Sequence, residues 1–532
     1  MATAGTPTLL GRGVVPFVLR LADLVAGLSR LADLGFGLPA GDALRCSALA
    51  VLLARDRDLP DDDVRAALYT GLLHHVGCVG FAHEAARAFG DEHRLNVASA
   101  RTNLVDPRDL VSTLLPMLTR GEPPRERARL VLTTLARGQK HGVANTTAAC
   151  EVGRDAARRL GLPEEVQRGI YTSYELWNGK GVPDGLAGED IPIAARLTAV
   201  ATAAALFDTI GGVETAVEVV RGRSGGMLDP ELCERFAGRA EALLGEVNGA
   251  DPYRLVLDAE PRPVASVLDP QLVDVAHVFA DLADVKTPYT HGHSRAVAAL
   301  ARDAGRELGC PPSDVADLEL AGLLHDVGRV AVSSAVWDKP GSLTADEWEQ
   351  VRLHAYHSER ILAGSERLAP LATLVGAHHE RCDGGGYHRG STCDQLPMPA
   401  RVLAAADAYQ AMTQPRPHRA ALVPEEAEKQ LLEDARAGVL DADAVTAVLA
   451  AAGHEAAVAR PEPPAGLTDR EVEVLGLVAR GRTNREVAEA LVISRRTAEH
   501  HVQNIYAKIG ASSRAAAALF AMEHDLIPRA NA

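Results

Sequence analysis

At 532 residues the chain is too long for one compact domain, and a prior of about 150 residues per domain indicates three or four. Hydrophobic residues make up 47% of the chain but aromatic residues only 4%, so the apolar surface is mostly alanine, leucine and valine, which favours helix over sheet. The formal net charge of -16 excludes a protein that coats nucleic acid along its whole length, because phosphate contacts need lysine and arginine. We therefore expect an all-α protein in which any DNA binding is confined to one part of the chain.

The cysteines and the start of the chain indicate a cytoplasmic protein. The seven cysteines include no C-x-x-C pair, so the sequence predicts reduced thiols, with neither a disulfide framework nor a structural zinc site. The N-terminal residues lack the basic region, apolar core and cleavage site of a signal peptide. No stretch reaches about 18 uninterrupted apolar residues, so we expect no membrane contact.

Residues 1–250 contain the first copy of an internal repeat. The segment ALYTGLLHHVGCVG at 67–80 parallels LELAGLLHDVGRVA at 318–331, and YELWNGKGVPDGLAGEDIPIAARLTAVAT at 174–202 parallels HERCDGGGYHRGSTCDQLPMPARVLAAAD at 379–407. The repeat aligns Asp42 with His293, His74 with His325, His75 with Asp326, Ser173 with His378, Tyr174 with His379, and Thr202 with Asp407. The copies thus share a scaffold but not the same potential metal ligands.

The first copy is interpreted as a degenerate duplicate. A dinuclear metal site cannot be held where a His-His pair is replaced by Ser173 and Tyr174, and an aspartate by Thr202. We interpret this half as a scaffold for packing and dimerisation. The alternative is a sensor pocket for a small ligand, because a site that has lost its metal can still present a concave surface.

Residues 251–272 carry four prolines and are interpreted as a connector that lets the halves pack or swing. The second copy occupies residues 273–459. At the start of this copy, apolar residues recur every three or four positions. This spacing places His293 on or just before the inward face of a long helix. A second helix is predicted over 318–330, with a His-Asp pair at its C-terminal end pointing into the same cavity.

Five imidazoles and two carboxylates recur at helical intervals in the second copy. The candidate metal ligands are His293, His325, Asp326, His354, His378, His379 and Asp407. Imidazole and carboxylate ligands suit iron or manganese, and two neighbouring ions can generate a hydroxide and hold a phosphodiester for in-line attack. The pattern predicts a hydrolytic site with two divalent transition-metal ions.

These residues stand in the order of a known set of motifs. The motifs are HS at 293–294, HDVGR at 325–329, DKPGSLTADEW at 338–348, the histidine of RLHAYHSERIL at 352–362, HHERCDGGGY at 378–387 and the aspartate of LAAADAYQAMT at 403–413. The segment resembles the HD-GYP subgroup of the HD phosphohydrolase superfamily, whose all-helical domains bind metals and hydrolyse cyclic di-GMP or related cyclic dinucleotides. The resemblance implies that Asp326 bridges two metals and that Lys339 and Arg416 contact phosphate.

The second copy departs from the HD-GYP pattern at four places. Arg329 stands where the family usually has lysine. The arginine keeps the positive charge, so we expect it to keep a catalytic role in phosphate contact. Residues 386–388 read Gly-Tyr-His in place of Gly-Tyr-Pro, and Gln410 replaces a common aspartate. Tyr289 stands where some members carry glutamate, which favours two metals over three.

The C-terminal part begins with a proline-rich linker, RPEPPAG at 460–466, after which the composition changes. Residues 467–532 carry helix-start signals, namely two capping boxes and a serine cap: Thr468 with Glu471, Thr483 with Glu486, and Ser494. Gly481 and Gly510 stand where helices end. The spacing predicts four short helices, and the tight turn between the second and third is typical of a helix-turn-helix.

This segment resembles the LuxR/GerE-type DNA-binding domain over its full length. The resemblance implies a recognition helix over 495–508 with Val502 and Ile505 facing the core, and a homodimer that pairs through the last helix, 514–523, on two half-sites of a promoter operator. The residues expected to face DNA are Arg495, Arg496, Thr497, Glu499, His500, Asn504 and Lys508. The chain from residue 466 has nine basic and eight acidic residues, so the acidic excess lies elsewhere.

The sequence therefore predicts two HD-domain-like helical bundles followed by a four-helix LuxR-type helix-turn-helix domain. Two functions remain open. In the first, the chain is a cytoplasmic one-component transcriptional regulator whose metal-dependent cyclic dinucleotide phosphodiesterase is coupled to DNA binding. In the second, it is a transcription factor whose HD-GYP pair only senses a nucleotide ligand and dimerises.

Overall fold

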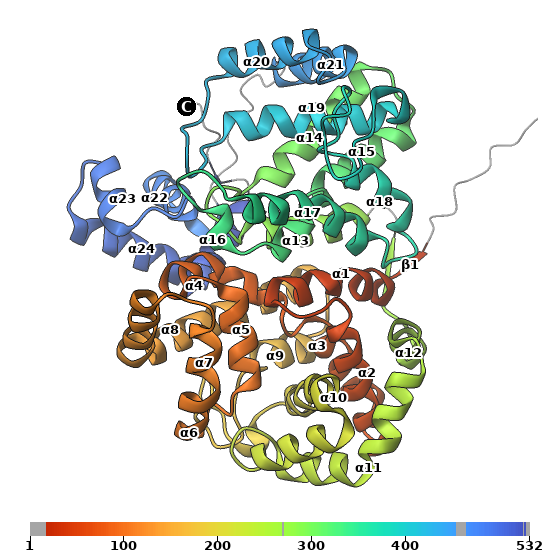
Figure 1. Cartoon of the computed structure of the whole chain (residues 1–532), viewed down its shortest axis with the longest axis vertical. Helices are drawn as coiled ribbons and strands as arrows, with labels where there is room; N and C mark the ends of the chain where they lie inside the picture. Colours follow the sequence, from red (N-terminus) through yellow and green to blue (C-terminus); the bar gives the residue numbers. More distant parts are fainter. Residues whose placement is uncertain (1–17, 269–270, 454–463, 525, 528–532) are drawn as a thin grey trace, which may run out of the picture.

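The computed structural model describes residues 18–268, 271–453, 464–524 and 526–527, and almost all of them lie in helices or their connections (Figure 1). Two short strands, β1 (Val18–Arg20) and β2 (Ser266–Leu268), pair antiparallel. The all-α prediction is confirmed, and the helices fall into two repeated units and a smaller C-terminal one.

The first unit comprises the helices between β1 and β2. They are α1 (Leu21–Phe36), α2 (Asp42–Asp56), α3 (Asp61–Leu73), η1 (Val76–Phe81), α4 (Ala82–Phe89), α5 (Glu92–Arg101), α6 (Pro107–Asp109), η2 (Leu110–Leu114), α7 (Leu115–Thr119), α8 (Pro124–Arg159), α9 (Glu164–Tyr171), η3 (Gly188–Asp190), α10 (Ile193–Arg223), α11 (Pro230–Gly249) and α12 (Pro252–Ala259). By length and composition α10 could cross a membrane, but 56% of its most apolar window is buried inside the protein. It packs on α2, α3 and α11 as a core helix.

The second unit follows β2 and contains every candidate metal ligand. Its elements are α13 (Leu272–Asp284), α14 (His293–Glu307), α15 (Pro312–Leu324), η5 (Val327–Ala331), α16 (Ser334–Trp337), α17 (Ala345–Leu362), α18 (Ala369–Gly376), η6 (Cys393–Gln395), α19 (Met398–Thr413), α20 (Pro424–Arg436) and α21 (Ala442–Gly453). The predicted long helix around His293 is divided, because α13 ends at Asp284 and α14 begins at His293 itself.

The structure repeats where the sequence repeats. Helices α2 and α14 each begin after a glycine with positive φ, Gly41 at 104° and Gly292 at 74°, a conformation that glycine adopts readily. Helices α3 and α15 each end one residue before the aligned His74 and His325. The alignment of the two copies therefore holds at the level of individual helix ends.

The two copies pack around a shared core. Helix α1 of the first copy lies between them and contacts η5 and α17 of the second (Figure 1). Gly27 on α1 permits this approach, since a Cβ there would lie 2.7 Å from the backbone nitrogen of Ser365 in the second copy. The connector at 251–272 contains α12 and β2, so it is ordered along much of its length.

The C-terminal unit has the four predicted helices. They are α22 (Asp469–Ala479), α23 (Asn484–Ala490), α24 (Arg495–Ile509) and α25 (Arg514–Glu523), preceded by the turn η7 (Pro464–Gly466). Both capping boxes and the Ser494 cap are present, and Gly510 ends α24 with φ of 67°. Val502 and Ile505 are buried as expected. The predicted linker lies partly outside the described residues, which resume at Pro464.

Helix α25 docks on the first copy. It packs on α8 and η1 as well as on α13 and α22, and its small residues Ala515, Ala517, Ala518 and Ala521 are buried. The side chains expected to pair two copies of the chain are therefore covered by the chain's own helices in this arrangement.

Polar contacts fasten α25 to α8. The backbone amide of Ser512, just before α25, donates to Glu151 at 2.9 Å. At the other end of α25, Glu523 forms an ion pair with Arg158 at 3.0 Å. The C-terminal unit is thus held to the first copy at both ends of its last helix.

The C-terminal unit also touches the loop that precedes α14. The Met522 sulfur accepts a hydrogen bond from the Gly292 amide at 3.3 Å. Pro288 lies so close to Gly481 that a Cβ on this glycine would stand 2.6 Å from the proline side chain. The loop over 286–292 therefore contacts the C-terminal unit through two of its residues.

Gly322→Ala is expected to destabilise the second copy. Gly322 lies where α15 crosses α14, and a Cβ would stand 2.4 Å from the Ala298 Cα, a backbone atom that cannot turn aside. We expect the free energy of unfolding to fall by roughly 1–3 kcal/mol, as for other overpacked cores, with a lower Tm in a thermal melt. Gly238→Ala on α11 is the control, because a Cβ there meets nothing within 4 Å. Equal Tm values for the two variants would contradict the close helix crossing.

Candidate functional site

The His325-Asp326 pair lies in a turn and not within a continuous helix. The sequence predicted one helix over 318–330, but α15 ends at Leu324 and the 3-10 turn η5 begins at Val327. The reason is close packing on α17, where a Cβ on Gly328 would lie 2.2 Å from a backbone carbonyl oxygen. The turn directs both side chains of the pair into the interior of the second copy.

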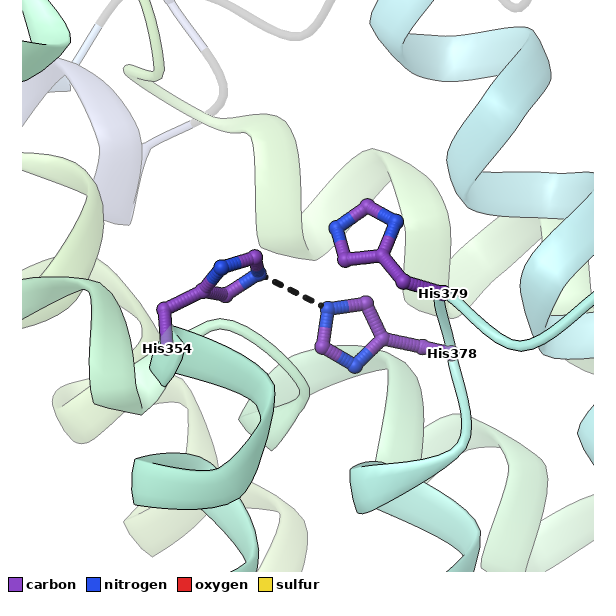
Figure 2. Close-up of side chains that lie close together, drawn as sticks. All are labelled: His354, His378 and His379. Carbon is purple, nitrogen blue, oxygen red and sulfur yellow. Dashed lines mark hydrogen bonds between the residues drawn. The ribbon is translucent and has the colours of Figure 1, made fainter. Parts of the chain in front are cut away.

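All seven candidate ligands converge inside the second copy. They come from the start of α14, the turn after α15, the middle of α17, the segment after α18 and the middle of α19. Their ligand atoms form three groups whose members lie within 4.8 Å of one another: His354, His378 and His379; His293, His325 and Asp407; and His325, Asp326 and His378. The shared members join the groups into one cluster, of which Figure 2 shows the first.

Three of these imidazoles present Nε2 lone pairs to the cluster. In each, Nδ1 lies 2.5–2.8 Å from the carbonyl oxygen three residues earlier: His325 with Gly322, His354 with Val351, and His378 with Val375. A carbonyl oxygen only accepts, so Nδ1 carries the hydrogen, and in the neutral ring Nε2 is bare. The Nε2 atoms of His354 and His378 nevertheless face each other at 3.1 Å (Figure 2). Such lone pairs repel unless a cation lies between them, and metal-bound histidines characteristically donate their other N–H group in this way.

Two buried atoms of the cluster also lack hydrogen-bond partners. Among the described residues, neither His325 Nε2 nor Asp326 Oδ1 has one. Buried polar atoms are rarely left unpaired, and a position that binds an ion is one of the usual reasons. The donor set of imidazole and carboxylate suits a transition metal. The residues of this cluster therefore fit a pair of divalent ions.

The electrostatics of the cluster favour bound positive charge. Burial alone would raise the pKa of Asp326, but Arg329 and His325 outweigh it and hold that pKa well below its usual value. Burial would lower the pKa of His325, yet the carboxylates of Asp326 and Asp407 hold it well above its usual value. The pKa of His379 is depressed by burial and by the neighbouring imidazoles. The carboxylates are therefore anionic and favour a proton on His325, which a bound metal ion would have to displace, because ligation requires a neutral imidazole.

The cluster opens into a cavity of about 750 Å³. Its lining includes Asp326, Arg329, Lys339 and Arg416, the four residues predicted to act in catalysis. Arg329 donates to Asp326 at 2.9 Å. Burial lowers the pKa of Arg416 to about 10, which still leaves its guanidinium charged at neutral pH.

Lys339 is engaged at the edge of the cavity. Its Nζ forms an ion pair with Glu347 at 2.6 Å, and both side chains are partly exposed. A phosphate group would have to replace this carboxylate before Lys339 could bind it.

Sequence reasoning missed three residues around the cluster. Gln414 accepts from His293 Nδ1 at 2.9 Å, which turns Nε2 of that ring toward Asp407. Trp337 lies 4.0 Å beneath the Arg329 guanidinium and donates to its carbonyl oxygen at 3.1 Å. Tyr387 stacks on His379 at 4.7 Å. The motifs already contained Tyr387, and Trp337 stands immediately before one of them, but only the fold shows which ligand or cation each supports.

The equivalent site in the first copy is filled by its own side chains. His74 makes the same Nδ1 contact as its counterpart, to a carbonyl oxygen at 2.7 Å, but its Nε2 lies 3.3 Å from the Thr202 hydroxyl. The Tyr174 hydroxyl lies 3.1 Å from His75, and Phe36 stacks on the same ring at 3.8 Å. This packing supports the scaffold interpretation over a sensor pocket at this position.

The prediction of reduced thiols is wrong for two cysteines. Cys382 and Cys393 form a disulfide, while the remaining five cysteines are free. The chain between them turns back on itself through an antiparallel bridge between Asp383 and Thr392, which brings the two sulfurs together. Their separation of 11 residues matches no common motif, so the sequence alone did not indicate the pairing.

The residues predicted to face DNA all lie on α24 and are at least partly exposed. Five of them are exposed, and Glu499 and Asn504 are partly exposed. Arg495 forms an ion pair with Glu499 at 2.9 Å, one turn along the helix. Lys508 contacts Glu471 at 2.7 Å, so its ammonium group supports the first capping box in this arrangement.

Family models match three stretches of the chain. Residues 147–211 and 277–444 match the HD domain, and residues 465–521 match the bacterial regulatory proteins of the luxR family. Two regions of the chain are HD-domain sequence and one is a luxR-family domain. The second HD region contains all seven candidate ligands, whereas the first begins after the His74-His75 pair.

The relatives of these HD regions are phosphodiesterases. The 3'3'-cGAMP-specific phosphodiesterase 3 of Vibrio cholerae is 29% identical over 405 residues, which cover 76% of this chain and 88% of that protein. The cyclic di-GMP phosphodiesterase PA4108 of Pseudomonas aeruginosa is 37% identical over 227 residues, and the chain spans 55% of its length. A crystal structure of a cyclic GMP-AMP-specific phosphodiesterase of V. cholerae superposes with a TM-score of 0.57 at 26% identity, covering 83% of this chain and 99% of that one.

Proposed function

We propose that the second HD region is a metal-dependent phosphodiesterase acting on a cyclic dinucleotide, and that the luxR-family domain binds promoter DNA as a homodimer. The main support for the first part is the pair of bare Nε2 atoms of His354 and His378, which face each other at 3.1 Å. The substrate class comes from the relatives, which act on 3'3'-cGAMP or cyclic di-GMP. The cavity of about 750 Å³ lies within the usual range of small-molecule sites.

The cluster would hold two divalent ions, iron or manganese, through the seven ligands. Bound there, such ions supply a hydroxide at neutral pH and withdraw charge from the phosphate. Arg329 and Arg416 present guanidinium groups to the same cavity and would orient the phosphate. As water adds to phosphorus and one ester oxygen leaves as a hydroxyl group, these cations offset the charge that develops on the phosphate oxygens.

The DNA-binding part of the proposal is supported by the match to the luxR family and by the exposed side of α24. The second helix of a helix-turn-helix contacts base edges from its N-terminal residues. The proposed DNA-contacting residues are Arg495, Arg496, Thr497, Glu499, His500, Asn504 and Lys508. The acidic remainder of the chain would be repelled by DNA, so contact should be confined to this domain.

The test combines metal analysis with hydrolysis of a panel containing 3'3'-cGAMP and cyclic di-GMP. We expect about two transition-metal ions per chain and a linear dinucleotide product that is absent after chelation. A metal-loaded protein that hydrolyses no member of the panel would overturn the enzymatic proposal.

A second candidate function is ligand sensing without turnover. The observation that favours it is the loop over 286–292, in which Thr287 and Tyr289 line the cavity. The same loop contacts the luxR-family domain through Pro288 and Gly292. An intact nucleotide could therefore change the position of the DNA-binding domain merely by occupying the cavity. Stoichiometric binding of a cyclic dinucleotide with no product would support this candidate.

A further inference from the structure

A buried ion pair joins the degenerate copy to the second copy beside the cavity. Glu92 is the first residue of α5, and Lys286 follows α13. Their side chains are 2% and 1% exposed, and Glu92 Oε1 lies 3.0 Å from Lys286 Nζ. Burial alone would raise the pKa of Glu92, but Lys286 and the hydrogen bonds described next bring it down to about 2. Burial lowers the pKa of Lys286, and the Glu92 carboxylate opposes that shift. Lys286 Nζ also lies 3.0 Å from His93 Nε2, so the pair has one further neighbour from the first copy.

Each member of the pair also holds a segment that lines the cavity. Lys286 Nζ donates to the Val330 carbonyl oxygen at 2.7 Å, which helps to fix the turn η5 directly after Asp326. Glu92 Oε2 accepts from the Ser333 hydroxyl at 2.6 Å, and Oε1 accepts from the Ser334 amide at 2.8 Å. One carboxylate from the first copy thus anchors both the start of α16 and, through the lysine, the preceding turn.

The anchored segment, residues 327–339, carries four of the residues that line the cavity. They are Arg329, Val336, Trp337 and Lys339. Helix α16 has only four residues, too few to hold its own position. A second anchor from the first copy lies at its end, where His83 Nδ1 is 2.6 Å from the Asp338 carboxylate. These contacts from the first copy therefore help to fix α16 and the residues that follow it.

We propose that Glu92 is a positioning residue for the cavity of the second HD region, acting through Lys286 and through Ser333 and Ser334 on residues 327–339. This inference rests on the proposed phosphodiesterase function for its kinetic consequence. The degenerate copy thereby gains a specific role, since a residue outside the metal-ligand cluster sets the position of the groups that would bind phosphate.

The experiment compares two variants of the full chain with the wild type. Glu92→Gln leaves a buried lysine charge unpaired and can fail to fold. The double variant Glu92→Leu/Lys286→Met replaces the pair by apolar side chains of similar volume, which buried pairs often tolerate. The control is Arg159→Gln, which breaks the buried ion pair of 2.6 Å between Arg159 and Asp281. That pair also joins the two copies, but neither of its residues lines the cavity.

In the double variant, amide hydrogen exchange over 327–339 should become faster by about tenfold or more, since opening of this segment no longer breaks the contacts made by Glu92 and Lys286. The metal content should stay at the wild-type level, because the seven ligands are intact. The KM for the cyclic dinucleotide should rise about tenfold with a smaller change in kcat, as expected when ground-state binding is lost. The Arg159 variant should match the wild type in exchange over 327–339 and in KM.

Unchanged exchange over 327–339 in a folded double variant would overturn the positioning role. Equal acceleration in the Arg159 control would overturn it as well, because the effect would then reflect general loosening between the copies. If the wild type hydrolyses no cyclic dinucleotide while exchange over 327–339 rises in the double variant alone, the proposed enzymatic function fails and the positioning role of Glu92 stands.

Discussion

Asp326→Ala is expected to remove both the bound metal and the hydrolytic activity. The Asp326 carboxylate lies 3.3 Å from His354, 3.4 Å from His325, and 3.6 Å from both His293 and His378. Asp326 therefore contacts histidines from all three groups of the cluster. Its replacement by alanine removes the carboxylate that these imidazoles share. Residues that only support metal ligands are worth roughly 10- to 100-fold, so we expect kcat/KM to fall by more than about 100-fold. Metal content per chain and hydrolysis of the preferred dinucleotide measure the effect.

His74→Ala provides the matched control for this prediction. His74 occupies the aligned turn of the first copy and makes the same backbone contact through Nδ1 as His325 does. Its Nε2 faces the Thr202 hydroxyl in place of a carboxylate, so no metal should depend on it. Loss of metal from this variant to the same extent as from Asp326→Ala would show that the first copy also binds metal.

The convergence of the candidate metal ligands was predictable because the direction of several of these side chains is set locally. His325, His354 and His378 each contact the carbonyl oxygen three residues earlier, so the local backbone fixes the direction of each ring. The periodic positions of these residues then place the rings on inward faces, which sequence patterns can indicate. The helix caps of the C-terminal unit were predictable for the same reason, since a capping box spans only four residues.

The contacts between units were not predictable, because they join positions far apart in the chain. Glu92 and Lys286 are ordinary charged residues in the sequence, and only the packing of the two copies buries them together. The pairing of Cys382 with Cys393 depends on a turn that no short motif records. The burial of α25 was likewise unexpected, since an alanine-rich helix can pack on a second chain or on its own chain equally well.

The docking of α25 has a consequence for DNA binding. If a homodimer pairs through α25, this helix must first leave α8, where Ser512 and Glu523 hold it. The loop over 286–292 contacts the same unit and lines the cavity, so a ligand that displaces this loop weakens the docked arrangement. A ligand can change DNA affinity only to the extent that it binds the docked and released arrangements differently.

The charge-swapped double variant Glu151→Lys/Arg158→Glu is therefore expected to bind operator DNA more tightly than the wild type. It breaks the Ser512 hydrogen bond and repels Glu523, and it leaves the net charge unchanged. Coupling between such sites is typically worth about 1–3 kcal/mol, so operator affinity should rise roughly 5- to 150-fold and become insensitive to a bound cyclic dinucleotide. Fluorescence anisotropy at fixed salt, with an operator selected from random DNA by the full chain, measures it.

The control for this variant is Glu126→Lys/Arg129→Glu. These residues form an ion pair of 2.5 Å on the solvent-exposed part of the same helix, and the swap again preserves net charge. Its binding curve should match that of the wild type, with and without nucleotide. The docking variant could also give the wild-type curve while the nucleotide is shown to be bound. The contacts of α25 would then carry no free energy that DNA binding has to overcome, and the DNA-binding domain would be tethered to the HD regions without being coupled to them.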